Sequence, residues 1–94
     1  MINVAGDRVE VSGAMTLTEA SKLLTEGNAT LSSAETLFDL SAVTAVDSSS
    51  IAVIFGWLRA ARQQGKSIRI VAPPQELLSL SSVYGVTELL PLAA

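Results

Sequence analysis

The sequence contains neither cysteine nor histidine. Without cysteine, the chain can form no disulfide bond and carry out no thiol chemistry. Without histidine, it lacks the commonest general base and the commonest metal ligand of proteins. A serine nucleophile would need such a base, and neither Lys22 nor Lys66 stands at a spacing typical of a serine–lysine pair. The glycines form no phosphate-binding pattern, so we expect neither an enzyme nor a bound cofactor or metal.

Basic residues are also few, with six Lys and Arg against nine Asp and Glu and a formal net charge of −3. Nucleic-acid binding requires clustered cations that displace the counterions of the phosphates. The one local concentration consists of Arg59, Arg62, Lys66 and Arg69, which we interpret as a solvated helix end and the loop after it. The chain is therefore not expected to bind nucleic acid.

Long apolar runs are absent as well. No apolar stretch reaches the length of ~18 residues that a membrane-spanning helix needs. The opening residues Met1–Val4 do not combine a basic segment with an apolar one, as a signal peptide would. The expected location is therefore the cytoplasm.

The 94 residues suit a single domain spanning positions 1–94. Hydrophobic residues make up 49% of the chain, whereas charged residues make up 16%. The charged share lies below the usual value of about 25%. This composition favours a domain that hides part of its surface against a partner.

Strand and helix patterns alternate along the chain. The first two strands are predicted to form a hairpin around Gly6–Asp7, with Val9 and Val11 facing inward and Gly13 ending the second strand. Residues 41–47 are expected to form a loop or a short turn. The predicted strands cover 2–4, 8–11, 36–40 and 67–71, the helices cover 16–26, 49–64 and 75–83, and a short end piece covers 86–92. This order favours an α/β domain whose partly parallel sheet is covered by helices.

Several local signals set the predicted helix ends. Thr16 and Glu19 stand at the spacing of a capping box. Gly27–Asn28 and Gly65 are typical of helix C-termini, and Pro73–Pro74 suits the first turn of the third helix. One face of the first helix gathers Leu17, Ala20, Leu23 and Leu24.

The helix predicted at 49–64 has an unusually wide apolar surface. One stripe, expected to pack on the sheet, is formed by Ile51, Ile54, Phe55 and Leu58. A second stripe contains Val53, Trp57 and Ala60, and Arg62 falls inside the arc that faces the core. The arc exceeds the ~100° of an ordinary surface helix. Either the third helix or another protein must cover the excess, and a large aromatic residue could anchor such a protein interface.

The strongest candidate site is the run Asp47-Ser48-Ser49-Ser50, which stands immediately before the apolar part of this helix. One interpretation is purely structural, because serine is a preferred N-cap and a carboxylate favours the positive end of a helix. A second interpretation is phosphorylation, since a phosphate at a helix N-terminus meets free backbone N–H groups and would repel or recruit a partner.

These residues carry a resemblance to a known family. Phe38-Asp39-Leu40-Ser41, followed by Val46-Asp47-Ser48-Ser49, resembles the signature of STAS domains, which include the anti-sigma-factor antagonists. The resemblance implies the STAS fold across nearly the whole chain, with a mixed β-sheet of about four to five strands covered by helices. In the members regulated by phosphorylation, the serine that follows the loop aspartate receives the phosphate, and Ser48 matches that position.

Other motifs resemble one branch of this family, the STAS subunits of the Mla lipid-asymmetry transporters. These motifs are Gly13-Ala14-Met15-Thr16, Leu23-Leu24-Thr25-Glu26-Gly27, Trp57-Leu58-Arg59-Ala60-Ala61, Tyr84-Gly85-Val86 and Glu88-Leu89-Leu90-Pro91. The resemblance implies a cytoplasmic, non-catalytic subunit that binds the ATPase subunit of an ABC transporter and reaches the membrane only through that complex and its permease. It also implies that Ser48 is part of the contact with the ATPase. The predicted site residues for partner binding or phosphorylation are Asp47, Ser48, Ser49 and Ser50, and those for partner binding alone are Trp57 and Tyr84.

The sequence departs from both branches at Ser50, where they usually place glycine, and this difference affects how closely a partner can approach. Two functions remain open at this point. One is a subunit that supports phospholipid transport between the two membranes of a Gram-negative cell. The other is an anti-sigma factor antagonist that is switched by phosphorylation of Ser48.

Overall fold

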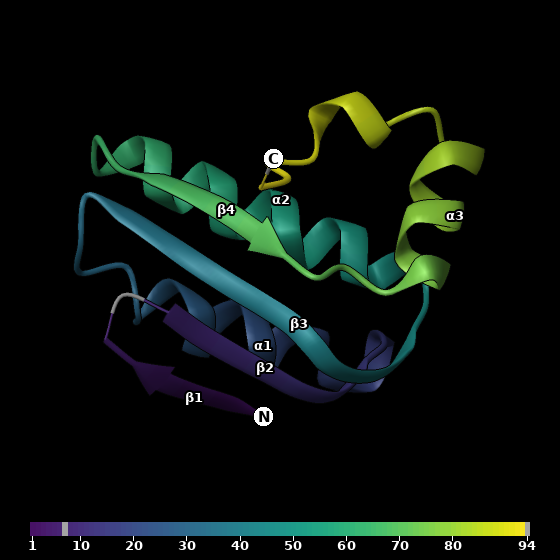
Figure 1. Ribbon diagram of the computed structural model, residues 1–94, viewed down its shortest axis with the longest axis horizontal. Coiled ribbons are helices and arrows are strands. Elements are labelled where there is room, and N and C mark those ends of the chain that lie inside the picture. Colours follow the sequence, from purple (N-terminus) through teal and green to yellow (C-terminus); the bar gives the residue numbers. More distant parts are fainter. Residues whose placement is uncertain (7, 94) are drawn as a thin grey trace.

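Four strands form one mixed sheet in the order β1-β2-β3-β4 (Figure 1). The computed structural model describes residues 1–6 and 8–93. β1 pairs with β2 in an antiparallel hairpin, whereas β2–β3 and β3–β4 are parallel pairs. The elements are β1 (Ile2–Ala5), β2 (Arg8–Met15), α1 (Leu17–Asn28), β3 (Glu35–Val46), α2 (Ser48–Gln63), β4 (Ser67–Val71), α3 (Gln75–Val83) and the 3-10 helix η1 (Thr87–Leu89).

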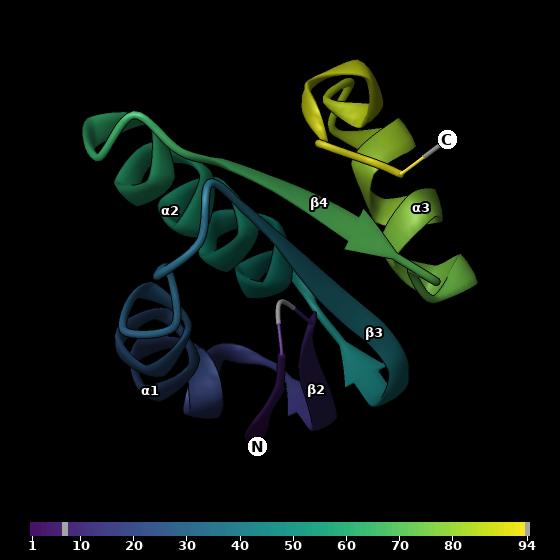
Figure 2. The same cartoon turned by 60° about the vertical axis from the view of Figure 1, so that its left-hand side comes forward.

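The helices cover one face of this sheet and the region beyond its edge strand β4 (Figure 1). α1 and α2 pack side by side against one face, whereas α3 and η1 lie beyond β4 (Figures 1 and 2). No helix within the described part of the chain has both the length and the apolar character needed to cross a bilayer.

The N-terminal hairpin confirms the predicted pairing of the first two strands. Val9 and Val11 are buried, and Arg8 and Glu10 are exposed, as their alternation predicted. Of the predicted turn residues, Asp7 lies outside the described residues. The prediction that Gly13 ends the strand is wrong, because β2 continues to Met15 through two shifts of register, one of them immediately after Gly13. Gly13 has a φ of +80°, which glycine adopts without strain at such an irregularity.

The prediction of a loop over residues 41–47 is also wrong. β3 runs to Val46, and its second half pairs with the second half of β2 beyond the point where β4 has ended. Most side chains in this half are exposed, so they give no clear burial alternation in the sequence. The partner strand, and not a local pattern, holds this segment in extended form.

α1 differs from its prediction at both ends. Leu17, expected on the apolar face, is 75% exposed, whereas Leu23 is fully buried. Thr16 makes no side-chain capping hydrogen bond, so the predicted capping box with Glu19 does not form. Gly27 lies inside the last helical turn, where it packs against α2 and does not terminate the helix.

The buried face of α2 is rotated from the predicted one. Ile51 and Ile54 are buried as expected, but Phe55 and Leu58 are half-buried and Arg62 is exposed. The buried positions are Ser50, Ile51, Val53, Ile54, Trp57 and Ala61. α1 packs along α2, so the most buried line of α2 faces the corner between α1 and the sheet. α1 therefore covers the side of the wide apolar arc that contains Trp57, which the sequence did not predict. Phe55 and Leu58 on the other side are left half-buried.

Trp57 joins three elements at the centre of the core. Its ring stacks on Phe38 of β3, with centroids 4.2 Å apart and planes 6° from parallel. Its Nε1–H donates a hydrogen bond of 3.1 Å to the carbonyl oxygen of Leu23 in α1. A Cβ added to Gly27 would lie 2.0 Å from that same Nε1. The glycine therefore provides the space that the indole occupies between the helices.

The C-terminal third follows its predicted boundaries closely. Gly65, with a φ of +67°, ends α2, and α3 begins directly after Pro73–Pro74. After η1, the chain returns to β4, where Leu92 forms an isolated parallel bridge with Ile70. The sheet thus has four strands, the lower number of the expected four to five, and the bridge lies beside β4 where a fifth strand would pair.

Candidate functional site

A single carboxylate, that of Asp47, caps both helices that cover the sheet. One oxygen accepts a 2.8 Å hydrogen bond from the backbone N–H of Ser49 in the first turn of α2. The other accepts a 3.0 Å hydrogen bond from the backbone N–H of Leu17, the first residue of α1. The hydrogen bond from Leu17, followed by those from Ser49, lowers the pKa of Asp47 because each favours the charged carboxylate. Asp47 therefore fixes the start of α2 relative to α1.

The three serines after Asp47 lie in three different environments. Ser48 is exposed at the first position of α2, and Ser49 is half-buried. Ser50 is fully buried, and its hydroxyl donates a 2.6 Å hydrogen bond to the backbone carbonyl of Asp47. In the structure Ser50 is therefore an internal helix-start residue, which removes it from the predicted partner-binding or phosphorylation set. Ser48 presents the most accessible hydroxyl of the three.

Ser48 and Tyr84 lie on the shared rim of two hollows. The larger hollow, of about 510 Å³, opens between the N-terminal end of α2 and α3. The smaller, of about 350 Å³, runs along the outer side of α2. We call this region the Ser48 groove, and it is lined by Val46, Asp47, Ser48, Ile51, Ala52, Phe55, Gln75, Glu76, Ser79, Leu80, Val83 and Tyr84. The fold thus brings together two residues predicted to bind a partner that are 36 positions apart in the sequence.

The Ser48 groove combines apolar surface with negative charge. Tyr84 is 58% exposed and Val83 is 81% exposed, so both offer apolar area to a partner. The charged side chains that line the groove are Asp47 and Glu76, and no Lys or Arg of the described chain joins them. A partner would match this surface with apolar side chains and a cation.

The sequence analysis missed the contribution of α3 to the groove. Gln75 and Glu76 begin α3 after a three-residue link from β4, whereas Asp47 and Ser48 follow β3 directly. Because β3 and β4 are parallel, the chain leaves both strands in the same direction, although β4 ends opposite Asp39 and β3 continues to Val46. Working residues usually lie at the carboxyl ends of parallel strands. Pro73–Pro74 marked the start of this helix, so the sequence did contain a signal for its position.

Trp57 has a different position from the one predicted. Its side chain is fully buried among α1, α2 and β3, so no partner can touch it while the domain keeps this fold. The feature that pointed to this packing was Gly27, because a glycine inside a helix frequently marks a close approach by a large side chain.

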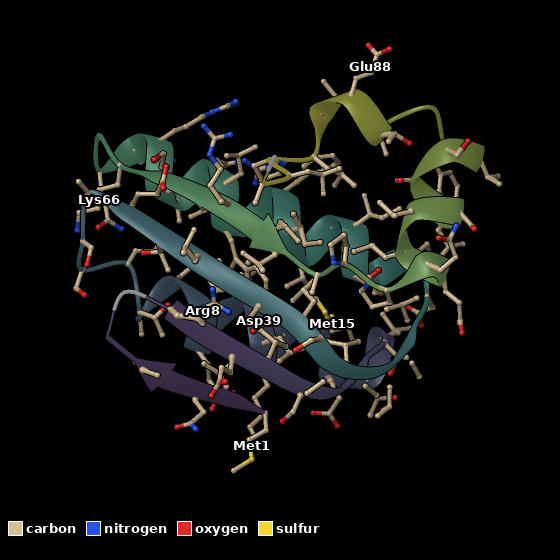
Figure 3. All side chains as sticks on the ribbon, viewed as in Figure 1. Met1, Arg8, Met15, Asp39, Lys66 and Glu88 are labelled. Carbon is tan, nitrogen blue, oxygen red and sulfur yellow. The ribbon has the colours of Figure 1, made fainter. Side chains whose placement is uncertain are left out.

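A second carboxylate, Asp39, lies outside the groove on β3. It forms a 3.0 Å ion pair with Arg8 of β2, and both residues are labelled in Figure 3. The hydrogen bonds that its carboxylate accepts from Ser41, and then the nearby Arg8 guanidinium, lower the pKa of Asp39. The ion pair links β2 to β3. Asp39 therefore has a structural role in the sheet and is not part of the candidate site.

Known proteins share this sequence pattern and this fold. The intermembrane phospholipid transport system binding protein MlaB of Haemophilus influenzae is 31% identical over 51 residues, which are 54% of this chain and 49% of that protein. The match therefore spans about half the length of that curated relative. The anti-sigma factor antagonist SpoIIAA, in its unphosphorylated form, aligns with a TM-score of 0.69 at 9% identity over 100% of this chain and 86% of that one.

A second solved structure supports the same architecture. An anti-sigma factor antagonist of Mycobacterium paratuberculosis aligns with a TM-score of 0.74 at 19% identity, over 98% of this chain and 81% of that one. At such identities the likeness establishes the fold alone. The family model described as "Mlab, STAS domain" matches residues 2–91, which is nearly the whole sequence. The chain therefore belongs to the STAS domain family of the MlaB type.

Proposed function

We propose that this chain is the non-catalytic STAS subunit of an Mla-type ABC transporter. In this role it binds the ATPase subunit of the complex and supports the phospholipid transport that maintains outer-membrane lipid asymmetry. The family match over residues 2–91 and the similarity to MlaB support this proposal. The subunit would lie in the cytoplasm and reach the inner membrane through the ATPase and its permease.

The observation that carries the proposal is the position of Ser48. Its side chain is exposed at the start of α2, on a rim that it shares with the exposed ring of Tyr84. Asp47 caps both α1 and α2 directly beside it, so the backbone that presents Ser48 is held firmly. Tyrosine is among the residues that most often anchor protein interfaces, and Ser48 lies on the same rim as Tyr84.

The test is co-purification of the chain with the ATPase subunit of the same organism's Mla-type transporter. We expect Ser48→Arg to reduce the yield of the complex strongly, because its bulk would fill the groove and its charge would repel the partner cation that matches Asp47 and Glu76. Tyr84→Ala should weaken the same complex by removing apolar contact area. Ser21→Arg is the matched control, since Ser21 is an exposed serine of α1 away from the groove.

The isolated domain must remain folded for this test to be informative, which a melting curve of each variant establishes. If Ser48→Arg gives the same yield of complex as the unaltered chain, Ser48 lies outside the interface. If Ser21→Arg reduces the yield equally, the effect does not belong to the groove.

We also propose that the chain itself carries out no catalysis. The absence of histidine and cysteine and the lack of a nucleotide-binding loop in the sequence support this view. The purified chain should neither bind nor hydrolyse ATP. Calorimetry that detects micromolar binding of ATP to the isolated chain would contradict it.

A second candidate function is that of an anti-sigma factor antagonist switched by phosphorylation of Ser48. The exposure of the Ser48 side chain favours this function, as does the likeness of the fold to anti-sigma factor antagonists. A phosphate would add about two negative charges beside Asp47 and Glu76 and so repel an acidic partner or recruit a basic one.

The two functions predict different partners. Incubation with a kinase-type anti-sigma factor and ATP, followed by mass spectrometry, should phosphorylate Ser48 if the second function is correct, and Ser48→Ala should remain unmodified. Capture of partners from the native cell would instead return the ATPase and permease if the first function is correct.

A further inference from the structure

Most of the positive charge of this acidic chain lies near one end of α2. Of the six basic residues, four are Arg59, Arg62, Lys66 and Arg69, on the second half of α2, the turn after it and β4. Figure 3 shows Lys66 at the end of α2 that is remote from α3. The other end of α2 carries the acidic Ser48 groove. The helix has sixteen residues and hence a length of about 24 Å, so its two ends carry opposite charges, and Phe55 between them lines a hollow on each side.

This basic end is hollowed and partly apolar. One hollow, of about 330 Å³, is lined by Phe55, Leu58, Arg59, Arg62 and Leu89, and we call it the basic groove. A neighbouring hollow of about 340 Å³ shares Leu58, Arg62 and Leu89 with it. Leu89, on η1, is 62% exposed, which is a large apolar area for a single surface residue. The basic groove is therefore a concave surface that is lined by apolar side chains and two arginines and that continues toward β4.

Two of the cations have no internal partner. Lys66 donates a 2.6 Å hydrogen bond to the backbone carbonyl of Leu31, and Arg69 forms a 3.5 Å ion pair with Glu35. In contrast, Arg59 and Arg62 are exposed and form no ion pair within the described residues.

The acidic residue beside Leu89 in the sequence, Glu88, does not neutralise Arg59 and Arg62. Glu88 lines the neighbouring hollow, but Figure 3 shows its carboxylate at the outer tip of η1, pointing away from α2.

We propose that the basic groove binds an acidic, amphipathic segment of a partner protein. Apolar side chains of that segment would pack on Leu58 and Leu89, and its carboxylates would pair with Arg59 and Arg62. Arginine suits this role because its planar guanidinium can hold a carboxylate by two parallel hydrogen bonds. This proposal does not rest on the proposed function, because it concerns the opposite end of α2 from the Ser48 groove.

The shape and charge of the region favour a protein segment over an anionic membrane. Side chains of a protein segment can fill a concave hollow, which a lipid surface bridges without entering. Attraction to anionic lipid is worth about 1 kcal/mol for each basic residue at the surface. Two unpaired arginines on a chain of net charge −3 give little attraction of that kind.

The test uses the full chain and a fluorescent synthetic peptide of about twelve residues, long enough for about three helical turns. The peptide carries leucine at every third or fourth position and glutamate between them. A second peptide replaces each glutamate by glutamine, and a third replaces each leucine by serine. Fluorescence anisotropy measures binding, and amide chemical shifts in NMR spectra of the protein locate it.

We expect the acidic, leucine-containing peptide to bind and to shift the amide signals of residues 58–62 and 88–90. The paired change Arg59→Gln and Arg62→Gln should weaken binding by about tenfold or more, because it removes both charged partners. Lys22→Gln, which removes an exposed cation of α1, is the matched control and should leave binding unchanged. Raising the salt concentration should weaken binding of the unaltered chain.

Four outcomes would overturn the proposal. The first is no binding at peptide concentrations up to about 1 mM, the limit of weak association. The second is equal binding of the glutamine peptide or of the serine peptide. The third is an equal effect of Lys22→Gln, which would indicate non-specific charge attraction. The fourth is binding to vesicles of phosphatidylcholine and phosphatidylglycerol without binding to the peptide, which would make this end of α2 a membrane-binding surface.

Discussion

Replacement of Gly27 by alanine tests the packing that sets the position of α1 on α2. In a helix, this change alone would gain about 1 kcal/mol of stability, because alanine is the better helix former. In this structure the new Cβ would lie 2.0 Å from Nε1, 2.4 Å from Cε2 and 2.8 Å from Cδ1 of Trp57. Such contacts are too short to persist, so either the indole or the helix must move.

The indole has little freedom to move. It stacks on Phe38 and donates its hydrogen bond to Leu23, so a displacement would disturb both contacts. Overpacking a core typically costs about 1–3 kcal/mol and occasionally more. We take the overpacking cost at about 3 kcal/mol, because both contacts of the indole are disturbed. Since the helix gain offsets about 1 kcal/mol of this cost, we expect Gly27→Ala to lower the free energy of unfolding by about 2 kcal/mol.

Gly56→Ala is the matched control. Its added Cβ would lie 2.4 Å from Cδ1 of Leu24, the far end of a flexible, half-buried side chain that can rotate away. We therefore expect Gly56→Ala to be neutral or to stabilise by up to about 1 kcal/mol. Urea unfolding measures both variants, and a loss of 2 kcal/mol would lower the melting temperature by roughly 8–16 °C. If Gly27→Ala were as stable as Gly56→Ala, the close contact between Gly27 and Trp57 would be wrong.

Three further predictions concern α2 and its cap. Asp47→Ala should lower the urea midpoint more than Asp47→Asn, because the amide oxygen can still accept one of the two capping hydrogen bonds. The lowered pKa of Asp47 adds stability that is present above the unfolded pKa of about 3.9 and is lost as the pH falls through the lower folded pKa. Asp47→Asn should therefore lose less stability than the unaltered chain when unfolding is compared at neutral pH and near pH 3. Ile54→Ala should cost about 2–5 kcal/mol and Leu58→Ala distinctly less, since Ile54 is fully buried and Leu58 is half-buried. Equal losses at the two positions would contradict the observed face of α2.

The candidate site was predictable in part. Ser48 could be found because a short polar run after an apolar strand and before an apolar helix marks a helix N-terminus, which is a local pattern. Its neighbours from α3 could not be found in this way. Glu76 and Tyr84 reach the same groove because β3 and β4 run parallel, and strand direction is set by pairing over long distances along the chain.

The sequence by itself determined the local boundaries of the fold. Alternation predicted the hairpin and β4, Gly65 predicted the end of α2, and Pro73–Pro74 predicted the start of α3. These features depend on the backbone preferences of a few neighbouring residues, so a short window of sequence contains them.

Only the tertiary structure decided which surfaces are buried. Trp57 was predicted as an interface residue and lies in the core, because α1 packs against that side of α2 and Gly27 leaves room for the indole. A serine was predicted to cap α2, with Asp47 only favouring the positive end of the helix. Asp47 is instead the N-cap of α2 and also accepts a hydrogen bond from Leu17 of α1, which lies beside it in space though thirty positions away in the sequence. A helical pattern shows which residues share a face, but burial depends on which other element covers that face, and distant parts of the chain supply that element.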